Sequence, residues 1–544
     1  MIEVADLEIV QGAPARTLVQ VDVLTFRPGQ ARVLVGRTGA GKSLIAKAVA
    51  GVPIPGAQVR GRLRRSDGGE NRLDAAAPPW RREVFLLPQE PADALDPTAP
   101  IGSQIAEVLR WRPARGRAVA RLAEAAAAVD LTTDDLGKLP HACSGGMLQR
   151  VLIAMALAAD ADLIVCDEPT KGLDALRRHE VSILLDRLKG AGPAVFVITH
   201  DLALARAIGD DLSVLEGGRI VEQGPMAALL DRPESLALKT LVQAEPGRWP
   251  DRSASAARSD PPLVRLDRVG YRIGGASQFL FRDVELAVHP GEIVGLSGPS
   301  GVGKTTLGNL ALGLGVPTEG TVSWHGQPLE TLPRHRHRRL RPDFARLFQD
   351  PTTTFPAWLT TGTVLRKLTP CRDDRYAGPG GLRDLIDRLQ LDRTVLDRRP
   401  GALSGGELQR LAIARMVLVR PAFVVCDEPS SRLDMVVQKQ AVDLLVGLCR
   451  DLAIGLLFIT HDTRILHRIA DRRVTLSDGI LQAEDATAPA ALAVPPASAA
   501  PRGCAGARAQ AVAAHRPSPR SRRFLDIDLR PAATLPSVDG HNEP

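Results

Sequence analysis

Short apolar runs recur along this chain, and polar residues follow them directly. LIVCDE (163–168) and AVFVITH (194–200) are two such runs, the first ending in two acidic residues and the second in a histidine. Continuous apolar runs of this length are typical of buried parallel strands whose carboxyl ends carry chemistry. The chain passes from strand to glycine-rich loop to helix, then through further helix to two apolar strands. We therefore predict an α/β fold with a mainly parallel sheet.

Four motifs occur twice in the same order, which identifies a tandem duplication. The offsets are nearly constant: 262 residues from Lys42 to Lys304 and 261 residues from His200 to His461. Chance does not place four motifs in one order at one offset. The repeated motifs are GRTGAGKS (36–43) and GPSGVGKT (298–305), SGGMLQR (144–150) and SGGELQR (404–410), VCDEP (165–169 and 425–429), and ITHD (198–201 and 459–462).

The composition between and after the copies indicates the domain boundaries. We expect a first domain over 1–244, ending in a helical extension, and a second domain over 263–484. Residues 245–262 are rich in Pro, Ser, Ala and Arg, which predicts a flexible linker. Residues 485–544 are biased toward Ala, Pro and Arg and have little hydrophobic periodicity, so we expect a largely disordered tail.

The glycine-rich motif predicts a phosphate-binding loop in each copy. Its glycines let backbone N–H groups wrap a phosphate at a helix N-terminus, whose dipole favours anions. Lys42 and Lys304 are expected to reach the β- and γ-phosphates of ATP, and the hydroxyls of Ser43 and Thr305 to bind Mg²⁺. The expected ATP-binding residues of the loops are Gly36, Arg37, Thr38, Gly39, Ala40, Gly41, Lys42 and Ser43, and Gly298, Pro299, Ser300, Gly301, Val302, Gly303, Lys304 and Thr305.

Two adjacent carboxylates end a predicted strand in each copy. Asp167 and Asp427 suit the holding of Mg²⁺ through water. Glu168 and Glu428 are placed to orient or deprotonate the attacking water. An acidic strand cap is the structural alternative, and the fixed distance to the glycine loop disfavours it.

A histidine and a glutamine complete the repeated set. His200 and His461 follow apolar strands and are expected to contact the γ-phosphate, although a lone histidine there would more often be structural. Gln89 and Gln349 follow the strands VFLLP and FARLF and are expected to sense Mg²⁺ and the attacking water, with the loops after them facing a partner. Recurrence at equivalent positions favours the functional interpretation in each case.

Together these residues resemble the ATPase domains of ABC transporters over almost the whole chain. SGGMLQR and SGGELQR are similar to that family's signature motif, in which Ser and two Gly present N–H groups to the γ-phosphate bound by the opposite domain. The resemblance implies two tandem P-loop NTPase domains, each with a helical signature subdomain, forming an intramolecular dimer with two composite ATP sites. One site would join Lys42, Gln89, Glu168 and His200 to Ser404, Gly405 and Gly406, and the other would join Lys304, Gln349, Glu428 and His461 to Ser144, Gly145 and Gly146.

A narrower resemblance concerns the importers of peptides and nickel. The SGGM and SGGE signatures, PQEPADALDP (88–97) and RPESLALKTLV (232–242) are similar to their ATPase subunits, which are usually two separate chains. This resemblance implies an energy-coupling subunit for peptides, nickel or metal–chelator complexes at the cytoplasmic face of the inner membrane. Its partners would be two permease subunits and an extracytoplasmic substrate-binding protein. Tyr271 aligns with the aromatic residue that stacks on adenine in the family, and its counterpart in the first copy is Ile9.

Composition and charge bear on the alternatives. The formal charge of +7 is small for 544 residues, so we expect a solvated basic surface and no nucleic-acid partner. A twin-ATPase factor acting on ribosomes would carry a long charged helical linker, whereas this linker is short. A DNA-repair ATPase would carry zinc-binding cysteine clusters, and none of the six cysteines forms a CxxC pair.

The sequence also bears on the cellular location of the protein and on its cargo. The most apolar stretch, 151–166, is too short and too charged to cross a membrane, and no secretory signal is visible, so we expect a soluble, cytoplasmic protein. An ABC subunit for another small-molecule cargo remains an alternative. The cargo, the role of the tail and the relative turnover of the two sites do not follow from the sequence.

Overall fold

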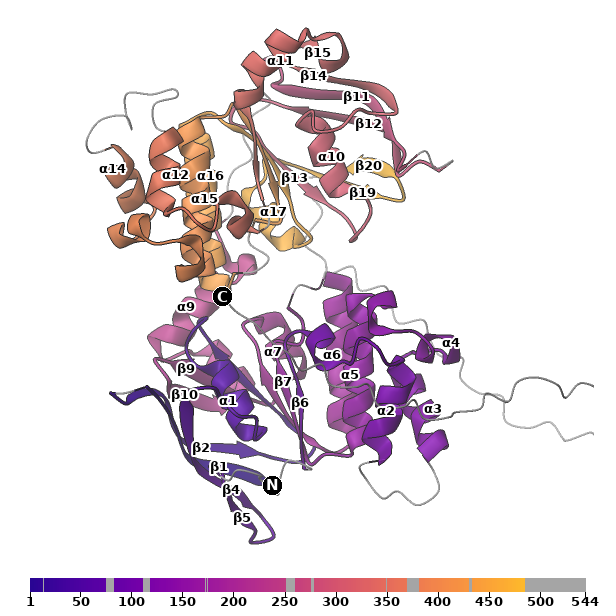
Figure 1. Ribbon diagram of the computed structural model, residues 1–544, viewed down its shortest axis with the longest axis vertical. Coiled ribbons are helices and arrows are strands. Elements are labelled where there is room, and N and C mark those ends of the chain that lie inside the picture. Colours follow the sequence, from indigo (N-terminus) through magenta and orange to yellow (C-terminus); the bar gives the residue numbers. More distant parts are fainter. Residues whose placement is uncertain are drawn as a thin grey trace, which may run out of the picture. The chain divides into compact units, whose positions relative to one another are not determined.

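The computed structural model describes residues 1–12, 14–74, 83–110, 118–171, 173, 175–250, 260–274, 278–348, 350–368, 381–429 and 433–484. Each sequence copy forms an α/β body around parallel strands (Figure 1). The expected tail and residues 251–259 of the expected linker lie outside the described residues. Among the described helices, none combines the length and the apolar composition that a bilayer crossing requires.

The first copy forms one ten-stranded sheet flanked by helices. Its strands are β1 (Ile2–Gln11), β2 (Arg16–Phe26), β3 (Ala31–Gly36), β4 (Ala57–Arg65), β5 (Glu70–Arg72), β6 (Val84–Leu87), β7 (Leu163–Asp167), β8 (Ala194–Ile198), β9 (Asp211–Glu216) and β10 (Arg219–Pro225). Its helices are α1 (Lys42–Val49), α2 (Ile101–Arg110), α3 (Ala118–Ala128), α4 (Thr133–Leu136), α5 (Gly145–Ala159), α6 (Ala175–Gly190), α7 (Leu202–Ile208), α8 (Met226–Asp231) and α9 (Leu236–Ala244). The strand order is β5-β4-β1-β2-β10-β9-β3-β8-β7-β6, and β9, β3, β8, β7 and β6 run parallel.

The second copy repeats this plan with its strands divided between two sheets. Its strands are β11 (Val264–Tyr271), β12 (Phe281–Val288), β13 (Ile293–Ser297), β14 (Glu319–Trp324), β15 (Gln327–Pro328), β16 (Phe344–Leu347), β17 (Phe423–Asp427), β18 (Gly455–Ile459), β19 (Arg472–Ser477) and β20 (Ile480–Ala483). Its helices are α10 (Lys304–Ala311), α11 (Arg334–Leu340), α12 (Thr361–Leu368), α14 (Gly381–Arg388), α15 (Gly405–Val419), α16 (Met435–Asp451) and α17 (Thr463–Ile469). The order β16-β17-β18-β13-β19-β20 repeats β6-β7-β8-β3-β9-β10 element by element, as expected of a duplication.

The central strands are apolar along their length because both faces of the sheet are covered. In β3, Val33 and Val35 belong to one buried cluster, whereas Leu34 belongs to another that contains Ile45 of α1. All five residues of β7, β8, β13, β17 and β18 are buried. The prediction of a mainly parallel sheet in each copy is confirmed.

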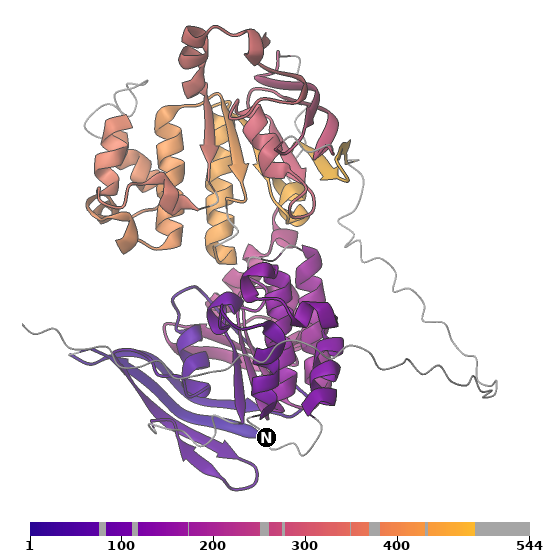
Figure 2. The same cartoon turned by 45° about the vertical axis from the view of Figure 1, so that its right-hand side comes forward.

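A group of helices packs beside the parallel strand at one edge of the sheet in each copy, β6 in the first and β16 in the second (Figure 1). In the first copy α5 contacts α2, α3, α6 and β6, and in the second copy α15 contacts α12, α14, α16 and β16. The signature motifs open α5 and α15, so each copy has the expected helical signature subdomain. Figure 2 shows that, in the first copy, the indigo strands spread away from the purple helices of this group.

Antiparallel strands form a second part of each copy that the sequence analysis did not predict. β1 pairs with β2 and β4, and β11 pairs with β12 and β14. Their pattern differs from that of the parallel strands because polar residues alternate with apolar ones. Arg62 on β4, for example, forms an ion pair with Asp6 on β1, while Leu63 is fully buried.

The expected flexible linker begins with an ordered segment. Pro246–Arg248 form a short 3₁₀ helix, and Trp249 directly after it is only 4% exposed. The indole Nε1 of Trp249 donates to the carbonyl of Ala244 at 2.9 Å, and the ring belongs to the buried cluster that otherwise spans residues 293–469. Polar composition predicted flexibility here, but one large aromatic residue buries enough apolar surface to order its neighbours.

Candidate nucleotide-binding and hydrolysis sites

The glycine-rich loops have the backbone shape that holds a phosphate. In each copy the loop connects a buried parallel strand to a helix that begins at the lysine, Lys42 or Lys304. The residues before these lysines, Gly41 and Gly303, have φ values of 103° and 107°. A Cβ on Gly41 would lie 2.6 Å from Cγ2 of Val19, so only glycine fits there. The loops thus present N–H groups at a helix N-terminus, which fits an anionic phosphate.

The two lysines lie over their own loops. The Nζ atom of Lys42 donates to the carbonyl oxygens of Gly36 at 2.7 Å and Arg37 at 3.1 Å. The Nζ atom of Lys304 makes the equivalent contacts with Gly298 at 2.8 Å and Pro299 at 2.7 Å. Burial lowers the pKa of Lys42, and the carboxylate of Glu168 opposes this shift. The cation is therefore held where the phosphates of a nucleotide would reach it.

The first acidic residue of each pair has a different partner in each copy. In the first copy the hydroxyl of Ser43 donates to Oδ1 of Asp167 at 3.1 Å. Burial raises the pKa of Asp167, and the Ser43 hydrogen bond acts in the opposite direction. In the second copy Nη2 of Arg346 donates to Oδ2 of Asp427 at 2.7 Å. Asp167 and Asp427 are buried to the same extent, so the two copies differ here in the hydrogen-bond partner of the aspartate.

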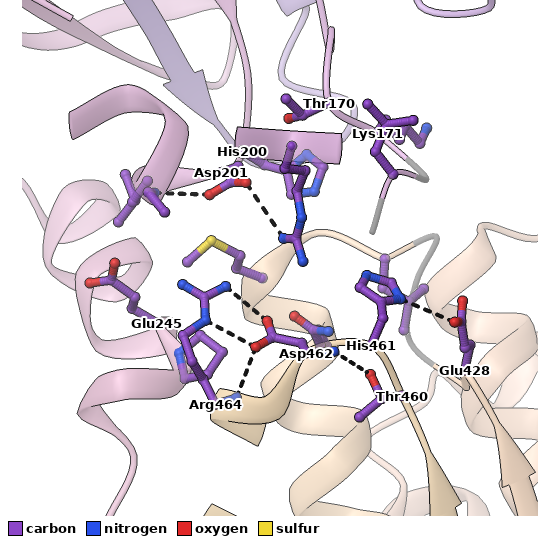
Figure 3. Close-up of a pocket in the computed structure, with 18 residues that line it drawn as sticks. Thr170, Lys171, His200, Asp201, Glu245, Glu428, Thr460, His461, Asp462 and Arg464 are labelled. Atoms are coloured by element: carbon purple, nitrogen blue, oxygen red, sulfur yellow. Dashed lines mark hydrogen bonds and ion pairs between the residues drawn. The ribbon is translucent and has the colours of Figure 1, made fainter. Parts of the chain in front are cut away.

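The second acidic residue of each pair contacts the repeated histidine. Nδ1 of His461 lies 3.1 Å from Oε1 of Glu428, and Figure 3 shows these side chains turned toward each other. Nδ1 of His200 lies 2.8 Å from Oε2 of Glu168. Burial of His200 opposes its protonation, but the hydrogen bond and charge of Glu168 outweigh burial and raise the pKa of His200. Each pair therefore holds a carboxylate and an imidazole beside the phosphate loop.

The two glutamates have an unusual backbone conformation. The φ angle is 52° at Glu168 and 47° at Glu428, in the left-handed region that side chains other than glycine rarely adopt. The N–H of Glu168 donates to the carbonyl of Ile198 at 2.8 Å, and that of Glu428 to Ile459 at 2.9 Å. Such strain costs about 1–3 kcal/mol and is found mainly at functional sites.

The signature motifs cap their helices. The hydroxyl of Ser144 accepts from the N–H of Met147 at 3.3 Å at the start of α5. At the start of α15, Ser404 and Glu407 form a capping box, with the N–H of Ser404 donating to Glu407 at 2.8 Å. Ser144 and Ser404 are both exposed, as are the glycines that follow them, Gly145 and Gly405. The second glycines, Gly146 and Gly406, are half-buried. The helix N-termini are thus open to an anion.

The remaining predicted residues have mixed outcomes. Gln89 is half-buried and lies two residues after the end of β6, whereas Gln349 lies outside the described residues. Tyr271 is half-buried and stacks on Phe281 with ring centroids 6.2 Å apart. Ile9 does occupy the position equivalent to Tyr271, but it is fully buried in the core. Ile9 therefore exposes no surface on which adenine could stack.

One hydrogen bond connects the first phosphate loop to the second copy. The N–H of Thr38 donates to Oδ2 of Asp434, the N-cap of α16, at 3.3 Å. The pocket in Figure 3 is lined by residues of both copies, among them His200 and His461. Within it Arg464 binds Asp462 through two hydrogen bonds of 2.9 and 2.8 Å. The pairing of Lys42 with Ser404 in one composite site stays a prediction.

Arg346 was not among the predicted site residues. The signal was a single arginine inside the apolar strand FARLF, at the position where the first copy has Leu86. A charge inside a predicted buried strand requires a partner, and Asp427 is that partner.

Comparison with known families supports the interpretation of the repeat. The sequence model of the family described as ABC transporter matches residues 20–171 and 281–431. The chain is 32% identical over 512 residues to the peptidoglycan transport ATP-binding protein YejF of Agrobacterium fabrum, covering 88% of this chain and 91% of that protein. It is 31% identical over 500 residues to the glutathione import ATP-binding protein GsiA of Salmonella typhi, covering 82% and 80%.

A solved structure with a similar double fold comes from another functional class. The archaeal ribosome recycling factor aABCE1, in complex with the ribosomal stalk protein aP1, superposes with a TM-score of 0.59 over 88% of this chain and 89% of that one. The sequence identity is 24%, so this likeness bears on the fold alone.

Proposed function

Because the chain belongs to the ABC transporter family and is an ATPase, we propose that it is the energy-coupling subunit of an importer. The observation that carries the hydrolytic part of the proposal is the repeated Glu–His pair beside a phosphate loop, at 2.8 Å in the first copy and 3.1 Å in the second. The importer part rests on the two relatives, whose names refer to transport and import. Because both copies retain this pair, we expect both sites to hydrolyse ATP.

ATP and Mg²⁺ would be held by residues of both loops and strand ends. The backbone N–H groups of residues 36–43, 298 and 300–305 fit the phosphates, with Lys42 and Lys304 above them. Tyr271 is proposed to stack on adenine in the second site. Bound Mg²⁺ would offset phosphate charge. Its proposed ligands, directly or through water, are Ser43, Gln89, Asp167, Thr305, Gln349 and Asp427.

Glu168 and Glu428 are proposed as the residues that orient and deprotonate the attacking water. His200 and His461 hold these carboxylates by hydrogen bonds and would contact the γ-phosphate. The exposed helix starts at Ser404 and Ser144 are proposed to complete the first and second sites. The hydrogen bond from Thr38 to Asp434 supports this intramolecular dimer, because it connects the first phosphate loop to the second copy.

Two membrane permeases and an extracytoplasmic substrate-binding protein are the proposed partners, and the chain would act peripherally at the cytoplasmic face of the inner membrane. The segment after Gln349 is the proposed permease contact, and Trp358, which is 74% exposed there, offers it an aromatic side chain of the kind that anchors interfaces. The relatives' names refer to peptidoglycan transport and glutathione import. Peptidoglycan and glutathione both contain amide-linked amino acids, so we favour peptides over nickel or metal–chelator complexes as the cargo.

Affinity purification from detergent-solubilised membranes tests the assignment. We expect two permeases to co-purify with the tagged chain, and ATPase activity of the complex to rise when a peptide-loaded binding protein is added. Trp358→Ala should reduce the permease yield without changing the ATPase activity of the isolated chain. Co-sedimentation with ribosomes in place of permeases would overturn the importer assignment in favour of a ribosome-acting factor.

A further inference from the structure

The proposed Mg²⁺ aspartates differ in one neighbour that the duplication places at equivalent positions. Leu86 lies opposite Val165 in the β6–β7 pair, and Arg346 lies opposite Val425 in the β16–β17 pair. Leu86 and Arg346 are 260 residues apart, which is the same offset as between Asp167 and Asp427. The two strands therefore place a leucine beside one carboxylate and an arginine beside the other.

Arg346 makes two hydrogen bonds with its side chain. Nη2 donates to Oδ2 of Asp427 at 2.7 Å, and Nη1 donates to Oδ1 of Asn309 on α10 at 2.7 Å. The side chains of Arg346 and Asp427 are only 19% and 11% exposed, so solvent screens this ion pair weakly. The residue equivalent to Asn309 in the first copy is Lys47, 262 residues earlier.

We propose that Arg346 is a positioning residue that weakens Mg²⁺ binding at the second ATP site, so that the first site takes up the metal–nucleotide complex at lower Mg²⁺ concentration. This inference rests on the proposed ATP and Mg²⁺ sites, and it is independent of the importer assignment. An arginine keeps its charge at every accessible pH, so it competes with the metal for the Asp427 carboxylate under all conditions. In the first copy Leu86 carries no charge, and Lys47 acts on Asp167 through its charge, whereas Arg346 donates a hydrogen bond to Asp427.

Two other contacts of Arg346 do not involve Asp427. Its guanidinium carbon lies 5.2 Å from the centroid of the Phe348 ring, and Asn309 remains as an acceptor when Asp427 is released. A metal entering the second site would therefore displace one of two hydrogen bonds and leave the other. The second site would then bind Mg²⁺ with reduced affinity.

Metal binding can be measured without turnover. The full chain carrying Glu168→Gln and Glu428→Gln is saturated with ATP, and Mn²⁺ is titrated as the probe by electron paramagnetic resonance. We expect two classes of site that differ about tenfold in affinity, the size of effect for one hydrogen bond between charged groups. Arg346→Met should tighten the weaker class toward the stronger one and leave the stronger class unchanged, whereas Arg346→Lys should keep two classes.

Two further variants separate competition from a merely structural role. Leu86→Met changes the equivalent residue of the first copy without adding charge, and it should leave both classes unchanged. Leu86→Arg combined with Lys47→Asn transfers the second-copy pair to the first copy and should weaken the stronger class. Melting temperatures show which variants fold. Equal Mn²⁺ affinities in the parent chain would overturn the proposal, and so would a weaker class that Arg346→Met leaves unchanged. The absence of any ATP-dependent Mn²⁺ site would instead contradict the proposed ATP and Mg²⁺ sites.

Discussion

Nδ1 of His200 lies 2.8 Å from Oε2 of Glu168. The two residues are 32 positions apart and come from the ends of two adjacent parallel strands, β8 and β7. The strand pairing therefore sets the distance between the carboxylate and the imidazole, and a rigid scaffold holds both groups where the water and the γ-phosphate are proposed to meet.

Replacement of either glutamate tests whether both sites hydrolyse ATP. Glu168→Gln and Glu428→Gln keep the shape of the side chain but remove its basicity, so each should slow its own site by about 10²–10⁴-fold. Because the sites are proposed to open together, either change should cut total turnover by more than half. Single-turnover hydrolysis in the permease complex measures this, with the exposed Glu216→Gln as control. Wild-type turnover in one mutant would show that its site only holds nucleotide.

The His200–Glu168 contact also predicts how stability depends on pH. Although burial opposes it, the carboxylate raises the pKa of His200 above the value of about 6.5 for a free histidine. The folded state then binds this proton more tightly than the unfolded state. The resulting stability is fully present below the unfolded pKa and is lost as pH rises through the folded pKa.

Glu168→Gln should therefore lower the melting temperature more at low pH than at high pH. We expect a larger shift at about pH 6 than at about pH 8.5 by differential scanning calorimetry, because a larger fraction of the histidine is charged at the lower pH. Glu216→Gln should give shifts that do not depend on pH in this range. A shift for Glu168→Gln that is the same at both values would contradict the charge-assisted contact.

The ordered start of the linker predicts a large stability effect. Trp249→Ala removes a side chain that is 4% exposed and should destabilise the fold by about 3–5 kcal/mol. Trp358 is 74% exposed, so Trp358→Ala is a matched control and should change stability by no more than about 0.5 kcal/mol. Urea unfolding followed by circular dichroism compares the two variants. Similar midpoints would show that Trp249 does not contribute to the core.

Tyr271 predicts unequal nucleotide affinity in the absence of metal. Aromatic stacking adds about 0.5–1.5 kcal/mol, a few-fold to about tenfold in affinity, and the buried Ile9 offers no equivalent surface. Titration with a fluorescent ATP analogue in EDTA should show the tighter class belonging to the Lys304 site. EDTA removes the Mg²⁺ effect proposed for Arg346. Tyr271→Ala should abolish the difference, and an unchanged difference would exclude stacking.

The repeated motifs made most of the two sites predictable. The spacing of Asp167, Glu168 and His200 from the glycine loop recurs in the second copy, and the structure brings these residues to adjacent strand ends in both. Continuous apolar runs likewise predicted the parallel strands, because such strands are buried on both faces.

Other features depend on contacts between residues distant in sequence. The partner of Arg346 is 81 residues away, and the burial of Ile9 depends on which side of a strand faces the core. Neither is encoded in a local pattern. Strand β4 escaped prediction because its alternating arginines resemble an exposed polar segment until their acidic partners on β1 are known. Trp249 shows the same point, since a Pro- and Arg-rich composition gave no indication of the cluster that buries it.

The left-handed backbone at Glu168 and Glu428 implies a trade-off between thermal stability and ATP hydrolysis at these two positions. Glycine adopts this conformation without strain, so Glu168→Gly would relieve the backbone while removing the base. In a laboratory evolution experiment that selects only for survival of heating, both glutamates should drift toward glycine or asparagine. In a selection for growth on an imported nutrient both glutamates should be retained, because growth then depends on ATP turnover more than on thermal stability.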